Sequence, residues 1–245
     1  GADALVLDVK CGRGAFMKTL EEARALAQSM VAVGRAHGMK IKALITRMEE
    51  PLGWAIGNAL EVMEAVEILK GQHGDSDLAR ESFRLAAEML VLGDAAATLA
   101  EAESLVAEAV RSGRAMETFR RWTRFNGGDP EALDDFSRLP RAAQQVVVTS
   151  PREGYLHGLD SRALGLLAME LGAGRRHKDD VLDLGVGLRV HIRVGQALRL
   201  GDPLFTVHAP SGAIVDPAPY LAAVDLRPEP AEPKPWLLES LDGSP

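Results

Sequence analysis

The sequence of 245 residues has a single cysteine, Cys11, which excludes a disulfide framework and a zinc site built on cysteines. Aromatic residues make up only 4% of the chain, which favours helices over an all-β sandwich. No apolar run approaches the about 20 residues that a membrane-spanning helix needs, and no signal peptide opens the sequence. We therefore expect a cytoplasmic protein with no membrane partner.

Basic residues are fewer than acidic residues. Lys and Arg number 28 against 35 Asp and Glu, so the net charge is −7 and no basic face for nucleic acid is expected. The six histidines form no His-x-His or His-x-x-x-His pair, and no Gly-x-Ser-x-Gly elbow occurs. The remaining composition, 47% hydrophobic and 26% charged, is that of a globular chain with a substantial core.

The first 46 residues have the pattern of a βαβ unit. An almost continuous apolar run over 3–10 predicts a strand buried on both faces, and a glycine loop follows it. Thr19 and Glu22 form a capping box that predicts the start of a helix, which Gly38 ends. A second strand is predicted over 40–46, so the two strands should lie parallel.

Helical patterns then dominate as far as residue 125. We predict helices over four segments that should cover one side of the sheet: 59–69, 78–92, 99–110 and 116–125. A capping box formed by Asn58 and Glu61 is expected to open the first of them.

From residue 144 the sequence alternates in the way of short strands, at 144–149, 155–159, 187–194 and 203–208, with one helix over 161–171. The segment 194–207 is typical of a hairpin in a barrel-sandwich domain. We therefore predict an α/β protein in which a parallel-sheet α/β domain covered by helices spans 1–144. A small α+β, barrel-sandwich-like C-terminal subdomain should span 145–226, and a proline-rich extended tail 227–245.

Two loops are candidate sites. Gly12-x-Gly14 lies between a strand and a helix, where backbone N–H groups can bind phosphate, but a third glycine is replaced by Met17 and a plain turn is favoured. The loop at 49–55 precedes a helix bearing Glu61 and Glu64. Freed carbonyls and one carboxylate could hold a hard cation there, although the residues alone favour a capped helix.

Three blocks, at 8–17, at 51–62 and from 183 to His208, resemble the pyrimidine-nucleoside and thymidine phosphorylases, in the order found in that family. The resemblance covers residues 1 to about 226. It implies a glycosyltransferase of pyrimidine metabolism and nucleoside salvage, which cleaves a pyrimidine nucleoside with inorganic phosphate into the free base and a pentose 1-phosphate. It also implies a homodimer with a small helical domain and a large α/β domain.

In the family, the phosphate loop, the pyrimidine-binding Arg and a Ser-x-x-x-Lys pair come before the strand at which this sequence starts. The resemblance therefore implies the C-terminal half, a piece of a longer polypeptide. We expect no catalytic residue on this chain, and no activity from it alone.

The resemblance implies roles for four residues. Phe16 matches a position that forms an apolar wall of the pyrimidine pocket. Leu52, Ala55 and Glu64 match a structural site for potassium or a similar cation, to which the first two give backbone carbonyls. Cys11, Arg13 and Trp54 depart from the family pattern in these loops.

Three further functions stay open. The blocks most resemble the broad-specificity phosphorylases, but strict thymidine specificity is one alternative. A related phosphorylase of nucleoside monophosphates is another, and a non-catalytic interaction or regulatory homologue is the third.

Overall fold

The computed structural model describes residues 2–243, and their contacts divide the chain into two compact units. Unit 1 takes in the described residues up to 49, 68–118 and those from 235 on, whereas unit 2 takes in 50–67 and 119–234. The chain thus passes between the units four times. This division differs from the single boundary predicted near residue 145.

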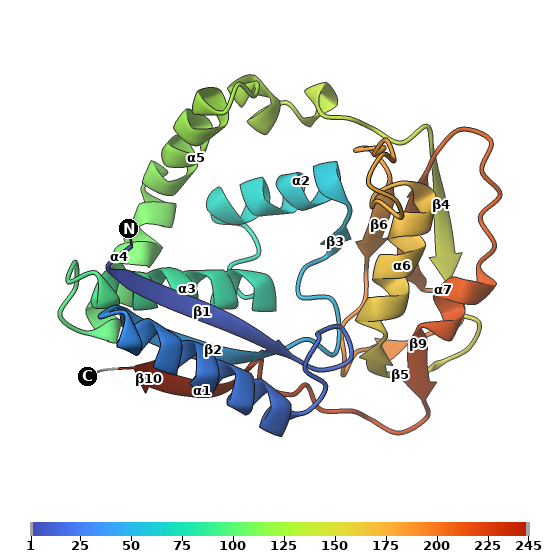
Figure 1. The fold of residues 1–245 in the computed structure, drawn as a ribbon. Helices are drawn as coiled ribbons and strands as arrows, with labels where there is room; N and C mark the ends of the chain where they lie inside the picture. Colours follow the sequence, from blue (N-terminus) through green and yellow to red (C-terminus); the bar gives the residue numbers. More distant parts are fainter. Residues whose placement is uncertain (1, 244–245) are drawn as a thin grey trace. The chain divides into compact units, whose positions relative to one another are not determined.

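Unit 1 is built on a three-stranded sheet of order β1-β2-β10 (Figure 1). Strand β1 (Ala4–Cys11) lies parallel to β2 (Lys40–Arg47), and helix α1 (Leu20–Ala36) connects them. The predicted βαβ unit is confirmed, but β1 is not buried on both faces as expected, because it lies at the end of the described sheet and only its Val9 and Cys11 are buried. Thr19 accepts from the Glu22 N–H while the Glu22 side chain accepts from the Thr19 N–H, which is the predicted capping box.

The core of unit 1 lies between α1 and the sheet. Helix α1 turns small residues toward the sheet, including Ala23 and Ala27, and they pack against Ile41, Ala43 and Ile45 of β2. These residues are all at most 2% exposed. Such short side chains let the helix approach the strands closely.

Helix α3 (Asp77–Leu92) contacts β1 and β2 through charged groups. Lys10 pairs with Glu81, and the Lys42 ammonium lies 3.0 Å from Glu88. Helix α4 (Leu99–Arg111) packs on α3, and α5 (Arg114–Phe125) follows it. Of the four helices expected to cover the sheet, the first, α2 (Asn58–Leu69), belongs to unit 2 as far as Glu67, and the last, α5, passes from unit 1 into unit 2 after Thr118.

The proline-rich segment ends in a strand, which the predicted tail did not include. Strand β10 (Leu237–Gly243) pairs antiparallel with β2 on the side away from β1. Its Leu238 and Leu241 pack against the core of unit 1. The burial of these leucines gives a physical reason for the strand to form after a proline-rich segment.

Unit 2 contains two antiparallel sheets. One has the order β3-β6-β8-β4 and the other β7-β5-β9. Their bounds are β3 (Ala55–Ile56), β4 (Gln144–Thr149), β5 (Gly154–Leu159), β6 (Gly187–Val190), β7 (Ala197–Leu198), β8 (Pro203–Ala209) and β9 (Val224–Arg227). Unit 2 also contains helices α6 (Ser161–Leu171) and α7 (Ala218–Ala222). Two 3-10 helices span Pro130–Leu133 and Phe136–Arg138. The hairpin predicted over 194–207 is not formed, because Ala197–Leu198 pairs in one sheet and Pro203–Ala209 pairs in the other.

The core of unit 2 is mostly aliphatic, with the buried rings of Phe205 and Tyr220 lying 6.4 Å apart within it. Phe205 is fully buried among Leu156, Leu164 and Leu188, which come from both sheets and from α6. Within residues 2–243, no helix is long and apolar enough to cross a membrane.

Candidate functional site

The entry to helix α2 is built around Gly57, not around Asn58 as predicted. The Gly57 carbonyl accepts the Glu61 N–H at 2.9 Å, and the Glu61 carboxylate accepts the Gly57 N–H at 2.9 Å. Asn58 instead donates its side-chain amide to the carbonyl of Ala173, also at 2.9 Å. Gly57 therefore caps the helix. The Asn58 side chain is not available as a cap, because it binds the Ala173 carbonyl just after α6.

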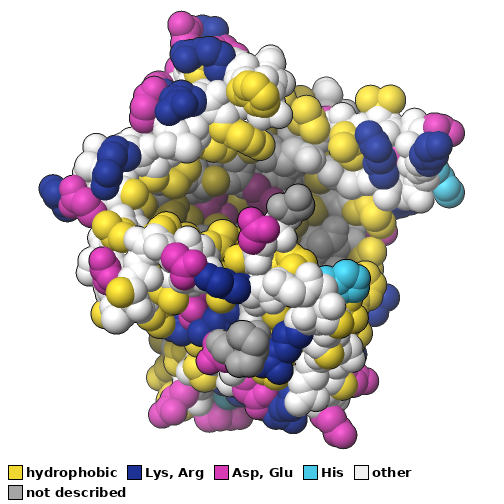
Figure 2. All heavy atoms as spheres, turned by 60° about the vertical axis from the view of Figure 1, so that its left-hand side comes forward, with side chains coloured by type: hydrophobic (Ala, Val, Ile, Leu, Met, Phe, Trp, Pro, Cys, Tyr) yellow, Lys and Arg dark blue, Asp and Glu magenta, His cyan; other side chains and the backbone are white. Residues whose placement is uncertain are grey.

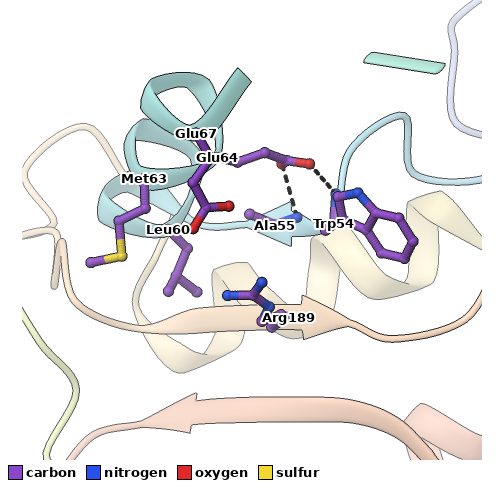
Figure 3. Close-up of a pocket in the computed structure, with 7 residues that line it drawn as sticks. All are labelled: Trp54, Ala55, Leu60, Met63, Glu64, Glu67 and Arg189. Carbon is purple, nitrogen blue, oxygen red and sulfur yellow. Dashed lines mark hydrogen bonds between the residues drawn. The ribbon is translucent and has the colours of Figure 1, made fainter. Parts of the chain in front are cut away.

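Glu64 turns back from α2 onto the loop that leads into the helix (Figure 3). Its Oε1 accepts the Trp54 N–H at 2.5 Å, and its Oε2 accepts the Ala55 N–H at 3.1 Å. The residue is only 4% exposed. One buried carboxylate thus satisfies two backbone donors of the loop, and the predicted proximity of Ala55 and Glu64 is observed.

Gly53 makes room for that carboxylate. A Cβ atom at position 53 would lie 2.3 Å from Glu64 Oε2 and 2.7 Å from Oε1, which is far inside contact distance. The backbone of Gly53 is not left-handed, so steric space alone requires glycine here. Leu52 precedes it in the same loop and is half-buried.

The pairing of β3 with β6 sets the direction of the Ala55 carbonyl. Val190 donates its N–H to the Trp54 carbonyl at 2.7 Å, and Ala55 lies opposite Arg189. Antiparallel pairs alternate, so the N–H and C=O of Ala55 both point away from β6. They therefore point to the side on which Glu64 accepts the Ala55 N–H.

Burial outweighs the neighbouring donors and positive charge, so the pKa of the Glu64 carboxyl is raised. Burial raises the pKa of the Glu64 carboxyl, whereas the Trp54 and Ala55 N–H bonds and the Arg193 charge act to lower it. The Arg193 guanidinium carbon lies 3.6 Å from the centre of the Trp54 ring, in a cation–π contact. The bulky Trp54, a departure from the family pattern, thus brings a positive charge near the loop.

A cavity of about 20 Å³ lies beside the carboxylate, large enough for one water-sized group. Figure 3 shows the residues that line it: Trp54, Ala55, Leu60, Met63, Glu64, Glu67 and Arg189. In the described part of the chain, no three or more His, Cys, Asp or Glu side chains are grouped so as to hold a metal ion. A cation here would therefore depend on backbone carbonyls.

Phe16 belongs to unit 1, whereas Leu52, Ala55 and Glu64 belong to unit 2. It lies on the loop that follows β1. Its side chain is 96% exposed. The loop beneath it is tied by hydrogen bonds from Gly12 N–H to the Met17 carbonyl at 2.9 Å and from Gly14 N–H to the Met48 carbonyl at 2.8 Å. These two N–H groups would serve a phosphate loop, so their internal use favours the plain turn.

A polar cluster under α3, in which Thr46 and Glu81 are buried and Asp8 and Lys10 are partly exposed, escaped sequence analysis. Lys10 lies 2.8 Å from Asp8, donates to Thr46 at 3.0 Å and pairs with Glu81, while Thr46 donates to Asp8 at 2.5 Å. Glu81 is 2% exposed, and burial raises its pKa to about 7 against the opposing effect of Lys10. The alternation of Asp8 and Lys10 in an apolar strand was the available signal.

Comparison with known proteins agrees with this architecture. Residues 1–116 match the "Glycosyl transferase family, a/b domain", and residues 155–223 match the "Pyrimidine nucleoside phosphorylase C-terminal domain". Proteins named pyrimidine-nucleoside phosphorylase from Staphylococcus aureus strains USA300, NCTC 8325 and COL are each 46% identical over 209 residues. The alignment covers 85% of this chain and 48% of each relative.

The chain thus spans about half the length of the curated relatives that it matches. Two domain matches and an identity of 46% over 85% of the chain lead to one conclusion: this chain belongs to the pyrimidine-nucleoside phosphorylase family.

Proposed function

We propose that this chain forms part of an enzyme that phosphorolyses pyrimidine nucleosides, with broad specificity. The observation that carries the proposal is the 46% identity over 85% of the chain to proteins named pyrimidine-nucleoside phosphorylase. In the reaction, a phosphate oxygen bonds to the anomeric carbon as the bond from that carbon to the pyrimidine nitrogen breaks. The departing base takes the electron pair, and a pentose 1-phosphate remains.

In that reaction, this chain would help to position the substrate. We propose that the exposed ring of Phe16 forms an apolar wall against the pyrimidine. Groups that bind phosphate and stabilise the leaving base are expected outside these residues. Losing even one preorganised donor lowers catalysis by about 10²–10³-fold. The isolated chain should therefore show no turnover of uridine or thymidine.

We further propose that the Leu52 and Ala55 carbonyls and the Glu64 carboxylate hold potassium or a similar cation. Three features fit such a group: a buried carboxylate kept close to the loop, an Ala55 carbonyl on its side, and a neighbouring cavity the size of one water. An all-oxygen shell suits a hard cation. A bound cation would supply fixed positive charge that holds the loop in place.

A chimera tests the reaction. The matched 209-residue segment of the S. aureus protein is replaced by this chain, and phosphorolysis of uridine and thymidine is followed by chromatography. We expect activity on both substrates from the chimera and none from the chain alone. A folded chimera without phosphorolysis would refute the proposed function, and cleavage of thymidine alone would indicate strict thymidine specificity.

The cation is tested in the same chimera by titration with potassium. We expect Glu64→Gln to weaken the potassium response of activity. Glu67→Gln is the matched control, because Glu67 lines the same cavity from the same helix, whereas both loop hydrogen bonds drawn in Figure 3 are accepted by Glu64. Identical titration curves for wild type and Glu64→Gln would show that Glu64 only stabilises the loop.

The family resemblance also supports a homodimer in the complete enzyme, and the single cysteine is in keeping with a reducing cytoplasm. Sedimentation of the active chimera should give the mass of a dimer, and a monomeric active species would contradict this part of the proposal.

A further inference from the structure

Helices α3 and α4 enclose a groove whose lining residues all belong to unit 1. Its volume is about 330 Å³, which falls within the range of about 300–1,000 Å³ that is usual for small-molecule sites. The lining residues of each helix follow the spacing that places side chains together on one helical face. They include Arg80, Phe83 and Arg84 of α3, Glu103 and Val106 of α4, and Trp236.

A buried carboxylate fixes the Arg84 side chain in this α3–α4 groove. Glu88 lies one turn further along α3, is 2% exposed and accepts the Arg84 Nε–H at 2.8 Å. Its other oxygen lies 3.0 Å from the Lys42 ammonium, so the carboxylate is itself held in place. Because Glu88 uses only Nε, the two terminal nitrogens of the guanidinium keep their N–H groups for another acceptor.

Arg80 brings a second guanidinium to the same wall of the groove. It lies one turn before Arg84, and 55% of its side chain is exposed. Its nearest carboxylate oxygen among the described residues belongs to Asp77, at a loose 3.9 Å. Glu103 lines the groove from α4, and within residues 2–243 no ion pair joins it to either arginine. The groove therefore has positive charge along α3 and a carboxylate on α4.

Aromatic rings complete the lining. Trp236 directly precedes β10, and its carbonyl accepts the Arg47 N–H at 2.7 Å, which fixes its backbone beside β2. Trp236 and Phe83 are both half-buried, so each ring keeps part of its surface open. Stacking on such rings suits any flat base, because every base has a π-face.

The groove differs from the general surface in how its charges are arranged. On the face drawn in Figure 2, Lys and Arg side chains are interspersed with Asp and Glu side chains. The whole chain has a net charge of −7, so its overall field does not attract anions. Two guanidinium groups beside two aromatic rings are therefore a local recognition feature.

We propose that the α3–α4 groove binds a nucleoside monophosphate, at a site separate from the apolar wall at Phe16. The phosphate would lie between Arg80 and Arg84, because guanidinium groups bind phosphate oxygens through paired N–H donors. The base would stack on Trp236, and ribose hydroxyls would donate to Glu103.

The occupant follows from the combination of groups. Inorganic phosphate would leave the rings uncovered, and an uncharged nucleoside would leave the two arginines without an anion. A nucleoside monophosphate supplies the anion, the flat ring and the hydroxyl donors in one molecule. The inference does not depend on the proposed reaction.

Binding to the 245-residue chain tests the inference without reference to catalysis. Uridine monophosphate and adenosine monophosphate are titrated by isothermal calorimetry, with uridine and inorganic phosphate as the partial ligands. We expect a Kd below about 1 mM for both nucleotides, and binding at least about tenfold weaker for uridine and for phosphate.

Arg80→Gln should weaken nucleotide binding about tenfold or more, because a charged contact to the phosphate is lost. Arg80 is the better choice for substitution, since Arg84 also holds the buried Glu88. Arg111→Gln is the matched control: it makes the same change of charge at an exposed side chain of α4 that is not part of the groove lining.

Trp236→Leu should weaken binding of both nucleotides without changing the weak binding of inorganic phosphate. Trp122→Leu on α5 is its control, because Trp122 is exposed and is not part of the groove lining. Phe16→Ala should leave nucleotide binding unchanged. Circular dichroism and urea unfolding of each variant verify that it is folded.

A Kd above about 1 mM for both nucleotides, or phosphate binding as tight as nucleotide binding, would overturn the proposal. So would equal nucleotide binding by Arg80→Gln and Arg111→Gln. Loss of nucleotide binding in Phe16→Ala would also overturn it, since the nucleotide would then occupy the proposed pyrimidine wall.

Discussion

Replacing Gly53 by alanine should destabilise unit 2 through a single clash. The added methyl would lie 2.3 Å from Glu64 Oε2, so the carboxylate must leave the Trp54 and Ala55 N–H groups. A hydrogen bond to a charged group contributes about 1.5–3 kcal/mol. Loss of one or both bonds should lower the free energy of unfolding by about 2–4 kcal/mol.

The same substitution should have the opposite sign when Glu64 is already alanine. The three atoms nearest to the added methyl all belong to the Glu64 carboxylate and are then absent, and the Gly53 backbone is not left-handed. Alanine would restrict the unfolded chain and stabilise the protein by about 0.4–1 kcal/mol. The double-mutant cycle should therefore give a coupling energy of more than about 2 kcal/mol between positions 53 and 64.

Urea unfolding followed by circular dichroism measures the four proteins of the cycle, and amide exchange at Trp54 and Ala55 reports the loop directly. Gly165→Ala is the control, because no atom lies within 4 Å of its added methyl. An equal effect of Gly53→Ala in both backgrounds would show that the carboxylate does not occupy the position seen in the structure.

Two other predictions concern burial. The Glu81 carboxyl keeps its proton to about pH 7 when folded but releases it near pH 4.5 when unfolded, so stability should fall between these values by up to about 3 kcal/mol. Glu81→Gln should flatten that fall in urea titrations from pH 4.5 to 7.5, and an unchanged slope would contradict the assignment. Gly187→Ala should lower the melting temperature much more than Gly201→Ala. Both backbones are left-handed, but only the first methyl would meet an atom, the Ile56 carbonyl oxygen at 2.2 Å. Equal shifts would refute the close antiparallel pairing of β3 and β6.

Local patterns predicted many of the elements, because periodicity and capping act over a few residues. Helix α6 and strand β4 have the predicted bounds, and helices α3 and α4 differ from theirs by one residue at one end. The capping box at Thr19 is present as expected. At the start of α2 the same rule was wrong about the cap, because Asn58 finds a partner in Ala173, 115 residues away.

The geometry of the loop at the candidate site could not be predicted from the sequence. Resemblance to the family indicated Leu52, Ala55, Glu64 and Phe16. That Glu64 binds two loop N–H groups, and that Gly53 must be glycine for it to do so, follows only from the folded loop. No spacing rule contains that information, since it depends on how far α2 tilts over the loop.

The sequence by itself determined the βαβ unit, most helices, the antiparallel C-terminal strands and the family, since each depends on neighbours within one element or one motif. The tertiary structure decided what joins distant segments: β10 on the far side of β2, most of α2 in unit 2, and β1 at the end of the described sheet. The physical reason is that pairing between strands is specified by which apolar faces remain to be buried. That is a property of the assembled sheet, and no single stretch of the sequence carries it.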